Sequence, residues 1–247
     1  YYRTWFPRFS KMAARIATVS GYSKQDIVTR YGIAADKVDV VYNGVGDIFS
    51  PLNEEEKRRT RERFTNGSAY LVCVGAMHRR KNLANTFAAF DRLAGTDPAI
   101  KLLIVGERMF KDARMEQAHS SMKHKDRVVF AGRLGQAELR LALGAATALV
   151  YTSYFEGFGI PVAEAMKCGV PVIAANATSL PEVAGEAAVY CEPFYVEDIA
   201  RAMRTVLQDE ALRARLIIAG IERAQRYTWD RTAEGLWTSI ERILAAR

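Results

Sequence analysis

The sequence has little cysteine, few histidines and no long hydrophobic run. Its three cysteines, Cys73, Cys168 and Cys191, form no Cys-x-x-Cys pair, which excludes a small disulfide-stapled scaffold and predicts reduced thiols in a core. No apolar run approaches the roughly 18 residues that a membrane-spanning helix requires. The three histidines show no metal-ligand spacing, so no metal site is predicted.

Several motifs that carry chemistry are also missing. No G-x-G-x-x-G follows a predicted strand, which disfavours a dehydrogenase. The P-loop, nucleophile-elbow and protein-kinase signatures are absent as well. The sequence holds no Asp-x-Asp pair that would carry a metal-bound diphosphate.

The sequence does contain a moderate excess of basic residues. Lys plus Arg number 35 against 28 Asp plus Glu, a formal charge of +7, which fits anionic ligands such as nucleotides and also acidic membrane surfaces. No dense basic run interleaved with aromatics appears, so nucleic-acid binding is not predicted. With 49% hydrophobic residues over 247 positions, we expect a globular protein of one or two domains. No charged-then-apolar leader is visible, so we expect a cytoplasmic location.

Short apolar runs alternate with segments at helical spacing through the middle of the chain. This alternation predicts an α/β fold, a Rossmann-like parallel sheet with helices on both faces. Ligands of such sheets lie beyond the carboxyl ends of the strands, so chemistry is expected in the loops that follow these runs. The predicted strands are residues 69–75, 101–106, 127–132, 148–152, 170–175 and 188–191.

The first 45 residues follow a different pattern. A short strand is predicted at residues 15–20 and another at 38–42. Between them, Ser23 with Asp26 predicts the capped start of a helix that Gly32 ends. The turn-rich stretch 43–46 predicts a domain boundary.

The strongest site signal is the segment from Glu156 to Glu164, which directly follows a predicted strand. Gly157 and Gly159 allow the backbone to approach a ligand. Pro161 suits the first helical position, and the helix would present free N–H groups to an anion. A carboxylate in its first turn can accept two ribose hydroxyls. Alternatively, Glu164 only complements the helix dipole and Glu156 is solvated.

Two further loops carry candidate groups. Arg79, Arg80 and Lys81 follow another predicted strand and precede a helix, where they can grip a diphosphate. A solvated basic turn is the alternative. Thr178 and Ser179, in the loop after the strand at 170–175, can add phosphate contacts or only cap a helix.

These segments, in this order, resemble the C-terminal, donor-binding half of the retaining GT-B glycosyltransferases of the group 1 or family 4 type. The resemblance is carried by Glu156-x7-Glu164, by Arg80-Lys81-Asn82 after Val74-Gly75, and by the stretch 169–174. It implies two Rossmann-like domains that face each other across a cleft. The C-terminal domain holds a nucleotide-diphosphate sugar there, and the N-terminal domain holds most of the acceptor.

The resemblance also implies roles for individual residues. Glu164 would bind the ribose hydroxyls, Glu156 the donor-sugar hydroxyls, and Lys81 the diphosphate. Many relatives carry an arginine where Ala76 stands, and Arg80 is assigned as the second phosphate cation instead. The other donor-binding positions that the resemblance implies are Gly75, Gly157, Phe158, Gly159, Ile160 and, beside the base, Arg133 and Leu134.

The resemblance divides the chain into three parts. Residues 1–45 would be the end of an acceptor domain whose beginning lies upstream, and the missing initial Met also predicts a fragment or a processed chain. Residues 46–226 would form the nucleotide-sugar-binding domain. Residues 227–247 would form a helix that crosses back to the acceptor domain.

The implied function is retaining, metal-independent sugar transfer without a cofactor, to a glycan or lipid-linked acceptor in cell-surface polysaccharide synthesis. GDP-mannose is favoured as donor, and UDP-sugars stay open. The alternatives are a nucleotide-sugar-binding module without activity and a sugar-nucleotide epimerase of the same fold. The aromatic and basic residues near the start could contact the inner face of a membrane or pack against the missing domain. They are Tyr2, Arg3, Trp5, Phe6, Arg8, Phe9 and Lys11.

Overall fold

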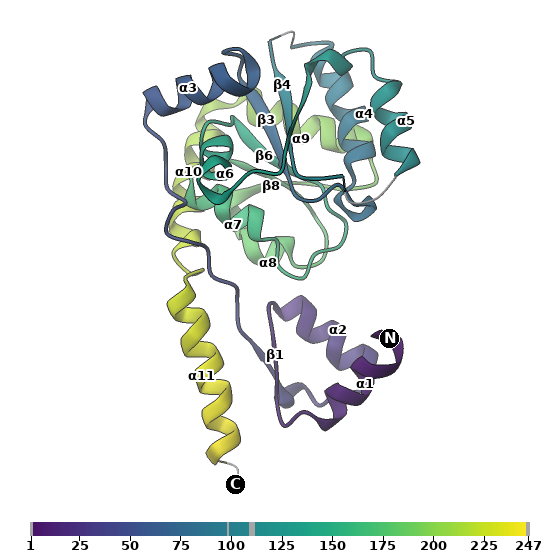
Figure 1. Ribbon diagram of the computed structural model, residues 1–247, viewed down its shortest axis with the longest axis vertical. Helices are drawn as coiled ribbons and strands as arrows, with labels where there is room; N and C mark the ends of the chain where they lie inside the picture. The colour runs from purple at the N-terminus through teal and green to yellow at the C-terminus, as the bar shows by residue number, and fades with distance from the viewer. Residues whose placement is uncertain (1, 98, 109–111, 246–247) are drawn as a thin grey trace.

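The computed structural model describes residues 2–97, 99–108 and 112–245, without the side chains of Tyr2 and Arg3. Figure 1 shows a large part built around a sheet and a smaller part that holds both ends of the chain. The sheet has six parallel strands in the order β5-β4-β3-β6-β7-β8. These strands are β3 (Tyr70–Val74), β4 (Lys101–Val105), β5 (Val128–Gly132), β6 (Ala148–Tyr151), β7 (Val172–Ala175) and β8 (Ala188–Cys191).

Helices cover both faces of this sheet, as the alternation predicted. On β3, Tyr70 and Val72 belong to one buried cluster, and Leu71 and Cys73 belong to the other, because successive strand residues point to opposite faces. The first cluster packs against α6 (Gln136–Gly144) and α7 (Ile160–Lys167), and the second packs against α4 (Leu83–Ala94) and α9 (Val196–Gln208). The remaining helices of this part are α3 (Glu54–Thr65), α5 (Ala113–Ser120), α8 (Leu180–Ala184) and α10 (Glu210–Ala224).

The predicted α/β fold is confirmed, since each predicted strand run contains an observed strand. The continuous apolar runs made this possible, because a parallel strand is buried on both faces. The three cysteines are free and buried. No described helix is long and apolar enough to cross a membrane.

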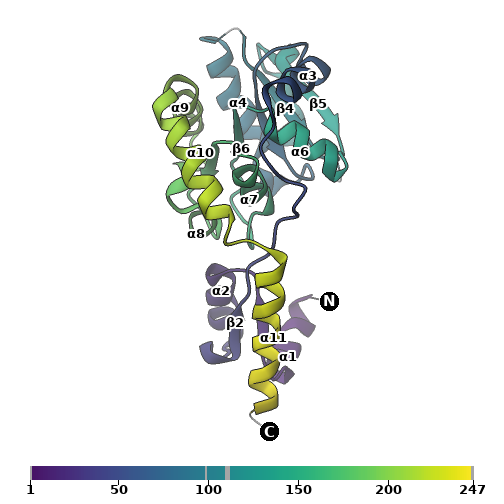
Figure 2. The same cartoon turned by 90° about the vertical axis from the view of Figure 1, so that its left-hand side faces the viewer.

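The smaller part contains α1 (Tyr2–Met12), α2 (Gly21–Tyr31) and a parallel pair of short strands, β1 (Ile16–Thr18) and β2 (Val38–Val40). Residues 41–53 lead from β2 to α3 without a helix or strand. The last helix, α11 (Trp229–Ala245), returns from the large part and runs beside β2 (Figure 2). Ser239 and Arg242 of this helix both donate hydrogen bonds to Asp39.

The predicted start of α2 is wrong by three residues. Ser20, and not Ser23, is the N-cap, because Ser20 has the extended backbone of a cap and its Oγ accepts from the N–H of Ser23. Gly32 ends the helix in the left-handed conformation, as predicted.

Candidate functional site

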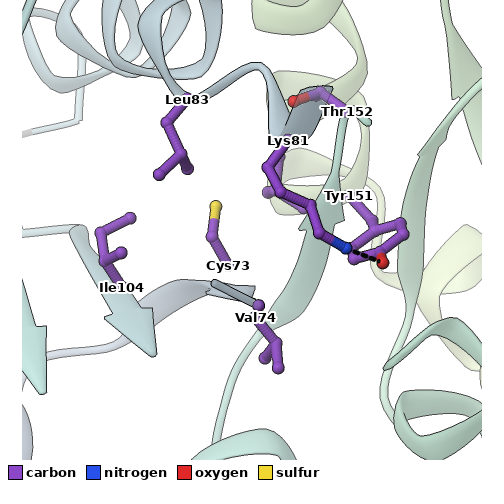
Figure 3. Close-up of a pocket in the computed structure, with 9 residues that line it drawn as sticks. Cys73, Val74, Lys81, Leu83, Ile104, Tyr151 and Thr152 are labelled. Atoms are coloured by element: carbon purple, nitrogen blue, oxygen red, sulfur yellow. Dashed lines mark hydrogen bonds between the residues drawn. The ribbon is translucent and has the colours of Figure 1, made fainter. Parts of the chain in front are cut away.

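The carboxyl ends of β3 and β6 bring two of the predicted site segments together. A single turn of 3₁₀ helix, Arg79–Lys81, follows β3, and Glu156 lies in the loop after β6. Lys81 Nζ is 2.6 Å from Glu156 Oε1 and 2.5 Å from Tyr151 Oη, the contact drawn in Figure 3. Arg80 Nη1 lies 2.5 Å from the same carboxylate oxygen. We call these four residues the Glu156 cluster.

Glu156 and Lys81 of this cluster are withdrawn from water. Only 11% of the Lys81 side chain and 10% of the Glu156 side chain are exposed, so neither is simply solvated. Burial alone would raise the pKa of Glu156, but the nearby charge and hydrogen bonds of Lys81, with the hydrogen bond of Arg80, outweigh it and hold that pKa below its usual range. The cluster therefore keeps an ionised carboxylate and two cations at one point of the sheet edge.

Tyr151 was not among the predicted site residues. Its hydroxyl donates to Glu156 Oε1 at 3.0 Å, and Lys81 Nζ lies 4.5 Å from its ring centroid. The residue was assigned only to a buried strand. A hydroxyl at the carboxyl end of that strand was the available signal.

The loop that carries Thr178 and Ser179 holds the loop that carries Glu156 in place. The Thr178 hydroxyl accepts the N–H of Glu156 at 3.1 Å, and the Ser179 hydroxyl donates to the carbonyls of Glu156 and Phe158. Ser179 makes no cap hydrogen bond to α8. These hydroxyls therefore fix the Glu156 loop and do not cap the following helix.

Gly159 is required for the turn into α7. It has φ of 99°, and a Cβ at this position would lie 2.7 Å from Leu180 Cδ2. Among the described residues no side chain caps α7, which leaves its N-terminus to a ligand. Pro161 was predicted as the first residue of this helix. The helix begins at Ile160, so Pro161 is its second residue.

Glu164 is the fifth residue of α7, one residue beyond the first turn in which it was predicted, and the first turn contains no acidic residue. Because the dipole effect fades beyond the first turn, complementing the dipole does not account for Glu164. Its carboxylate makes no hydrogen bond or ion pair with any described residue, and burial raises its pKa to about 7. A half-buried carboxylate without a partner is free to accept hydrogen bonds from a ligand.

A cavity of about 310 Å³ opens at the same edge of the sheet. Its lining includes Gly75, Gly106, Arg133 and Leu134. The backbones of β3 and β4 pack closely here, because a Cβ on Gly106 would lie 2.1 Å from the Gly75 carbonyl oxygen. The structure thus brings the predicted base-flanking residues Arg133 and Leu134 to one cavity with Gly75. We call it the Gly75 cavity.

Two families match the chain. The family "Glycosyl transferases group 1" matches residues 54–223, and "Glycosyltransferase Family 4" matches residues 1–47. The first match covers more than half of the chain. The chain belongs to the group 1 glycosyltransferase family.

Two named relatives are similar to most of this chain. The "O-antigen chain mannosyltransferase B" of Escherichia coli is 29% identical over 220 residues, which span 88% of this chain and 58% of that protein. The "Glycogen synthase" of Mycobacterium tuberculosis is 31% identical over 225 residues, spanning 88% of this chain and 51% of that enzyme. The chain therefore spans between half and three fifths of the length of these two relatives.

Solved structures share the fold. The "Sucrose-phosphate synthase" of Thermosynechococcus elongatus has a TM-score of 0.82 and 25% identity, and covers 95% of this chain over 59% of its own length. The Anabaena protein Alr3699/HepE in complex with UDP and glucose has a TM-score of 0.83 and 20% identity. The match covers 94% of this chain and 64% of the Anabaena chain. The resemblance seen in the sequence is confirmed at the level of family and fold.

Proposed function

We propose that this chain binds a nucleotide-diphosphate sugar at the carboxyl edge of its sheet and forms the donor-binding part of a retaining glycosyltransferase. One observation carries the proposal. The Glu156 cluster, the uncapped start of α7 and the carboxylate of Glu164 share this edge with the Gly75 cavity. Cations, a hydroxyl-accepting carboxylate and a cavity for a base match the three parts of such a donor.

Each group has a proposed role. Glu164 accepts the two ribose hydroxyls, and the Gly75 cavity takes the base beside Arg133 and Leu134. Lys81 and Arg80 bind the diphosphate. Glu156 faces the donor-sugar hydroxyls while it holds both cations in place. The backbone of residues 157–160 lies against the sugar and phosphates.

The proposed reaction breaks the bond between the sugar and the diphosphate, and negative charge develops on the departing phosphate. Lys81, Arg80 and the start of α7 stabilise that charge. The acceptor hydroxyl attacks the anomeric carbon from the same face of the sugar and passes its proton to the departing phosphate oxygen, so the anomeric configuration is retained. Glu156 positions the sugar and is not assigned as a nucleophile.

We propose GDP-mannose as the donor and a glycan or lipid-linked glycan as the acceptor, in polysaccharide synthesis at the inner face of a membrane. The mannosyltransferase names of relatives support mannose. The complex of the Anabaena protein with UDP-glucose supports a UDP-sugar instead. The identity of the nucleotide base is therefore the first property to determine.

The test is a thermal-shift and calorimetric titration of the chain with GDP, UDP and ADP, beside a Glu164→Ala variant. A nucleotide at about 100 times its dissociation constant stabilises by roughly 2.7 kcal/mol, which raises the Tm of a chain of this size by about 5–10 °C. We expect one nucleotide to shift the wild type and not the variant. Glu234→Ala, on α11, is the control and should keep the shift.

A shift that persists in Glu164→Ala contradicts the assigned ribose contact. No shift with any nucleotide, repeated on a protein extended to the length of its relatives, contradicts the donor site itself. Transfer of sugar to water or acceptor by the extended protein separates a transferase from a binding module. Conversion of the free nucleotide sugar to its epimer identifies an epimerase.

We propose α1 as the part that meets the membrane. Trp5, Phe6 and Phe9 are each between 41% and 48% exposed, and Arg8 and Lys11 lie on the same helix. Such a combination inserts aromatic rings into an anionic interface. The side chains of Tyr2 and Arg3 lie outside the described residues. Flotation with anionic vesicles should fail for a Trp5→Ala/Phe9→Ala variant, and failure of the wild-type extended protein to float removes this contact.

A further inference from the structure

A second pocket opens near the start of α4, and it shares no lining residue with the Gly75 cavity. Its volume is about 80 Å³. It lies where the 3₁₀ turn, the start of α5 and the loops after β6 and β8 meet. Its polar and aromatic lining residues are Arg79, Asn82, Asn85, Arg114, Tyr154 and Phe194.

Two guanidinium groups of this pocket have no partner among the described residues. The side chains of Arg79 and Arg114 are exposed and make no hydrogen bond or ion pair with any described residue. Arg79 is adjacent in sequence to Arg80, whose guanidinium turns to Glu156. A 3₁₀ turn has three residues per turn, so consecutive side chains point in different directions. One short turn thus supplies cations to two separate places.

The carboxylate of the pocket does not cancel these charges. Asp112 Oδ1 accepts the backbone N–H groups of Arg114 and Met115 and so caps α5. With two guanidinium charges against this one carboxylate charge, the lining of the pocket stays net positive. A planar guanidinium pair favours carboxylate or phosphate oxygens.

Side-chain amides fix the shape of the pocket. The amide nitrogens of Asn82 and Asn85 both donate to the carbonyl of Pro193, at 2.5 and 3.1 Å. These bonds tie the loop after β8 to the start of α4. Their amide oxygens remain as acceptors, which suit the hydroxyl groups of a ligand.

An exposed aromatic pair forms the rim. The rings of Tyr154 and Phe194 lie 5.4 Å apart with an angle of 34° between their planes. Phe194 is 66% exposed, so one large apolar ring face is open to solvent. The N–H of Tyr154 donates to the carbonyl of Arg80 and holds this rim against the 3₁₀ turn. A ligand with an apolar C–H face can cover the ring and remove it from water.

We propose that this pocket, the Arg79–Arg114 pocket, binds an anionic sugar residue of a glycan. A carboxylate or phosphate group enters the small pocket between the two guanidinium groups, and the sugar ring lies over Phe194. The amide oxygen of Asn85 accepts a hydrogen bond from a hydroxyl group of the sugar ring. The choice of a glycan rests on the proposed function, in which the chain meets a glycan acceptor. The pocket would hold that glycan beside the donor site and outside it.

The test is an NMR titration of the 247-residue chain with a glucuronate-containing disaccharide, mannose 6-phosphate, a neutral glucose disaccharide and inorganic phosphate. We expect the two anionic sugars to bind at least about tenfold more tightly than the neutral one, a difference of about 1.4 kcal/mol. The variants are Arg79→Gln/Arg114→Gln and Phe194→Ala. Arg215→Gln, an exposed arginine of α10, is the matched control.

The double variant should lose about tenfold in affinity for the anionic sugars, Phe194→Ala severalfold, and the control nothing. Equal affinity for the neutral disaccharide overturns the role of the cations. Inorganic phosphate that binds as tightly as mannose 6-phosphate, with no effect of Phe194→Ala, overturns the sugar site. Which anionic sugar binds more tightly separates a carboxylate ligand from a phosphorylated one.

The same samples are titrated with the nucleotide that binds the wild type. Nucleotide affinity should be unchanged in Phe194→Ala, because the donor site lies elsewhere. A wild-type chain that binds anionic sugar and no nucleotide contradicts the proposed function and leaves the pocket standing. A chain that binds nucleotide and no anionic sugar contradicts the pocket alone.

Discussion

Two charge clusters in this molecule are built from similar parts. In the Glu156 cluster, a carboxylate oxygen accepts from Lys81, Arg80 and the hydroxyl of Tyr151. In the smaller part, the carboxylate of Asp39 accepts from Arg15, Arg242 and the hydroxyl of Ser239. Each combines one acidic group, two cations and one hydroxyl.

Their geometry separates them. Arg15 spans both oxygens of Asp39 at 2.7 Å, and the cluster joins the residue that precedes β1 to β2 and to the last helix. That hydrogen bonding holds the pKa of Asp39 well below its usual range. At Glu156 all three donors crowd one oxygen, Oε1, at the sheet edge where ligands of α/β folds bind. Similar residues thus form a clamp in one place and a candidate site in the other.

Lys81→Ala should have the largest effect. It removes a cation from the diphosphate that departs, so sugar transfer by a protein extended to the length of its relatives should fall by about 10²–10³-fold. Lys167→Ala, which breaks the exposed ion pair with Asp47, is the control. Transfer rates with purified donor and acceptor make the comparison. Equal rates in wild type and Lys81→Ala would contradict the role of the Glu156 cluster.

Asp39→Asn should act on stability alone. It leaves Arg15 and Arg242 without their shared carboxylate and should cost about 2 kcal/mol of unfolding free energy. Since the folded pKa of Asp39 is depressed, this contribution is present above pH 4 and is lost as the pH falls below it. Denaturant unfolding measures the change, with Asp26→Asn, which breaks the more exposed ion pair with Arg30, as the control. If Asp39→Asn lowered the free energy of nucleotide binding as much as the free energy of unfolding, the two clusters would not differ in role.

Glu164 should make nucleotide binding depend on pH. Its pKa of about 7 means that the acceptor form grows roughly tenfold between pH 6 and pH 8, and affinity should rise with it. Glu164→Gln should remove this slope, which calorimetry at several pH values measures. The raised pKa has the opposite effect on the free chain, whose stability should decline as the pH rises from about 4 to 7. A pH-independent affinity in the wild type would contradict the ribose contact.

The sequence allowed the sheet and most residues of the candidate site to be predicted, for physical reasons that differ by region. Buried parallel strands are continuous apolar runs, and the loops after them were the places to search. The helix caps were less certain, because Ser20 and Ser23 are both good capping residues and only the backbone decides between them. Glu164 was placed one residue too early in α7, because the helix begins at Ile160 and not at Pro161.

Contacts between distant segments were not predictable from one sequence. Asp39 meets Arg242 and Ser239 across about 200 residues, and no local pattern marks such a partnership. The sequence around Tyr151 indicates only a strand. Its role depends on Lys81, which lies beside it because β3 and β6 are neighbours in the sheet. The Arg79–Arg114 pocket was missed because its walls come from four separate segments.

Tyr151→Phe should have the smallest effect and sharpens the comparison most. It removes the hydroxyl that contacts Lys81 and Glu156 but keeps the ring beneath Lys81, so nucleotide affinity should fall by about three- to tenfold, near 1 kcal/mol. The matched change in the other cluster is Ser239→Ala, which should lower the Tm and leave affinity unchanged. Calorimetry and thermal unfolding of both variants test the pair. If Ser239→Ala weakened nucleotide binding as much as Tyr151→Phe does, the smaller part and the sheet edge would have to act as one site.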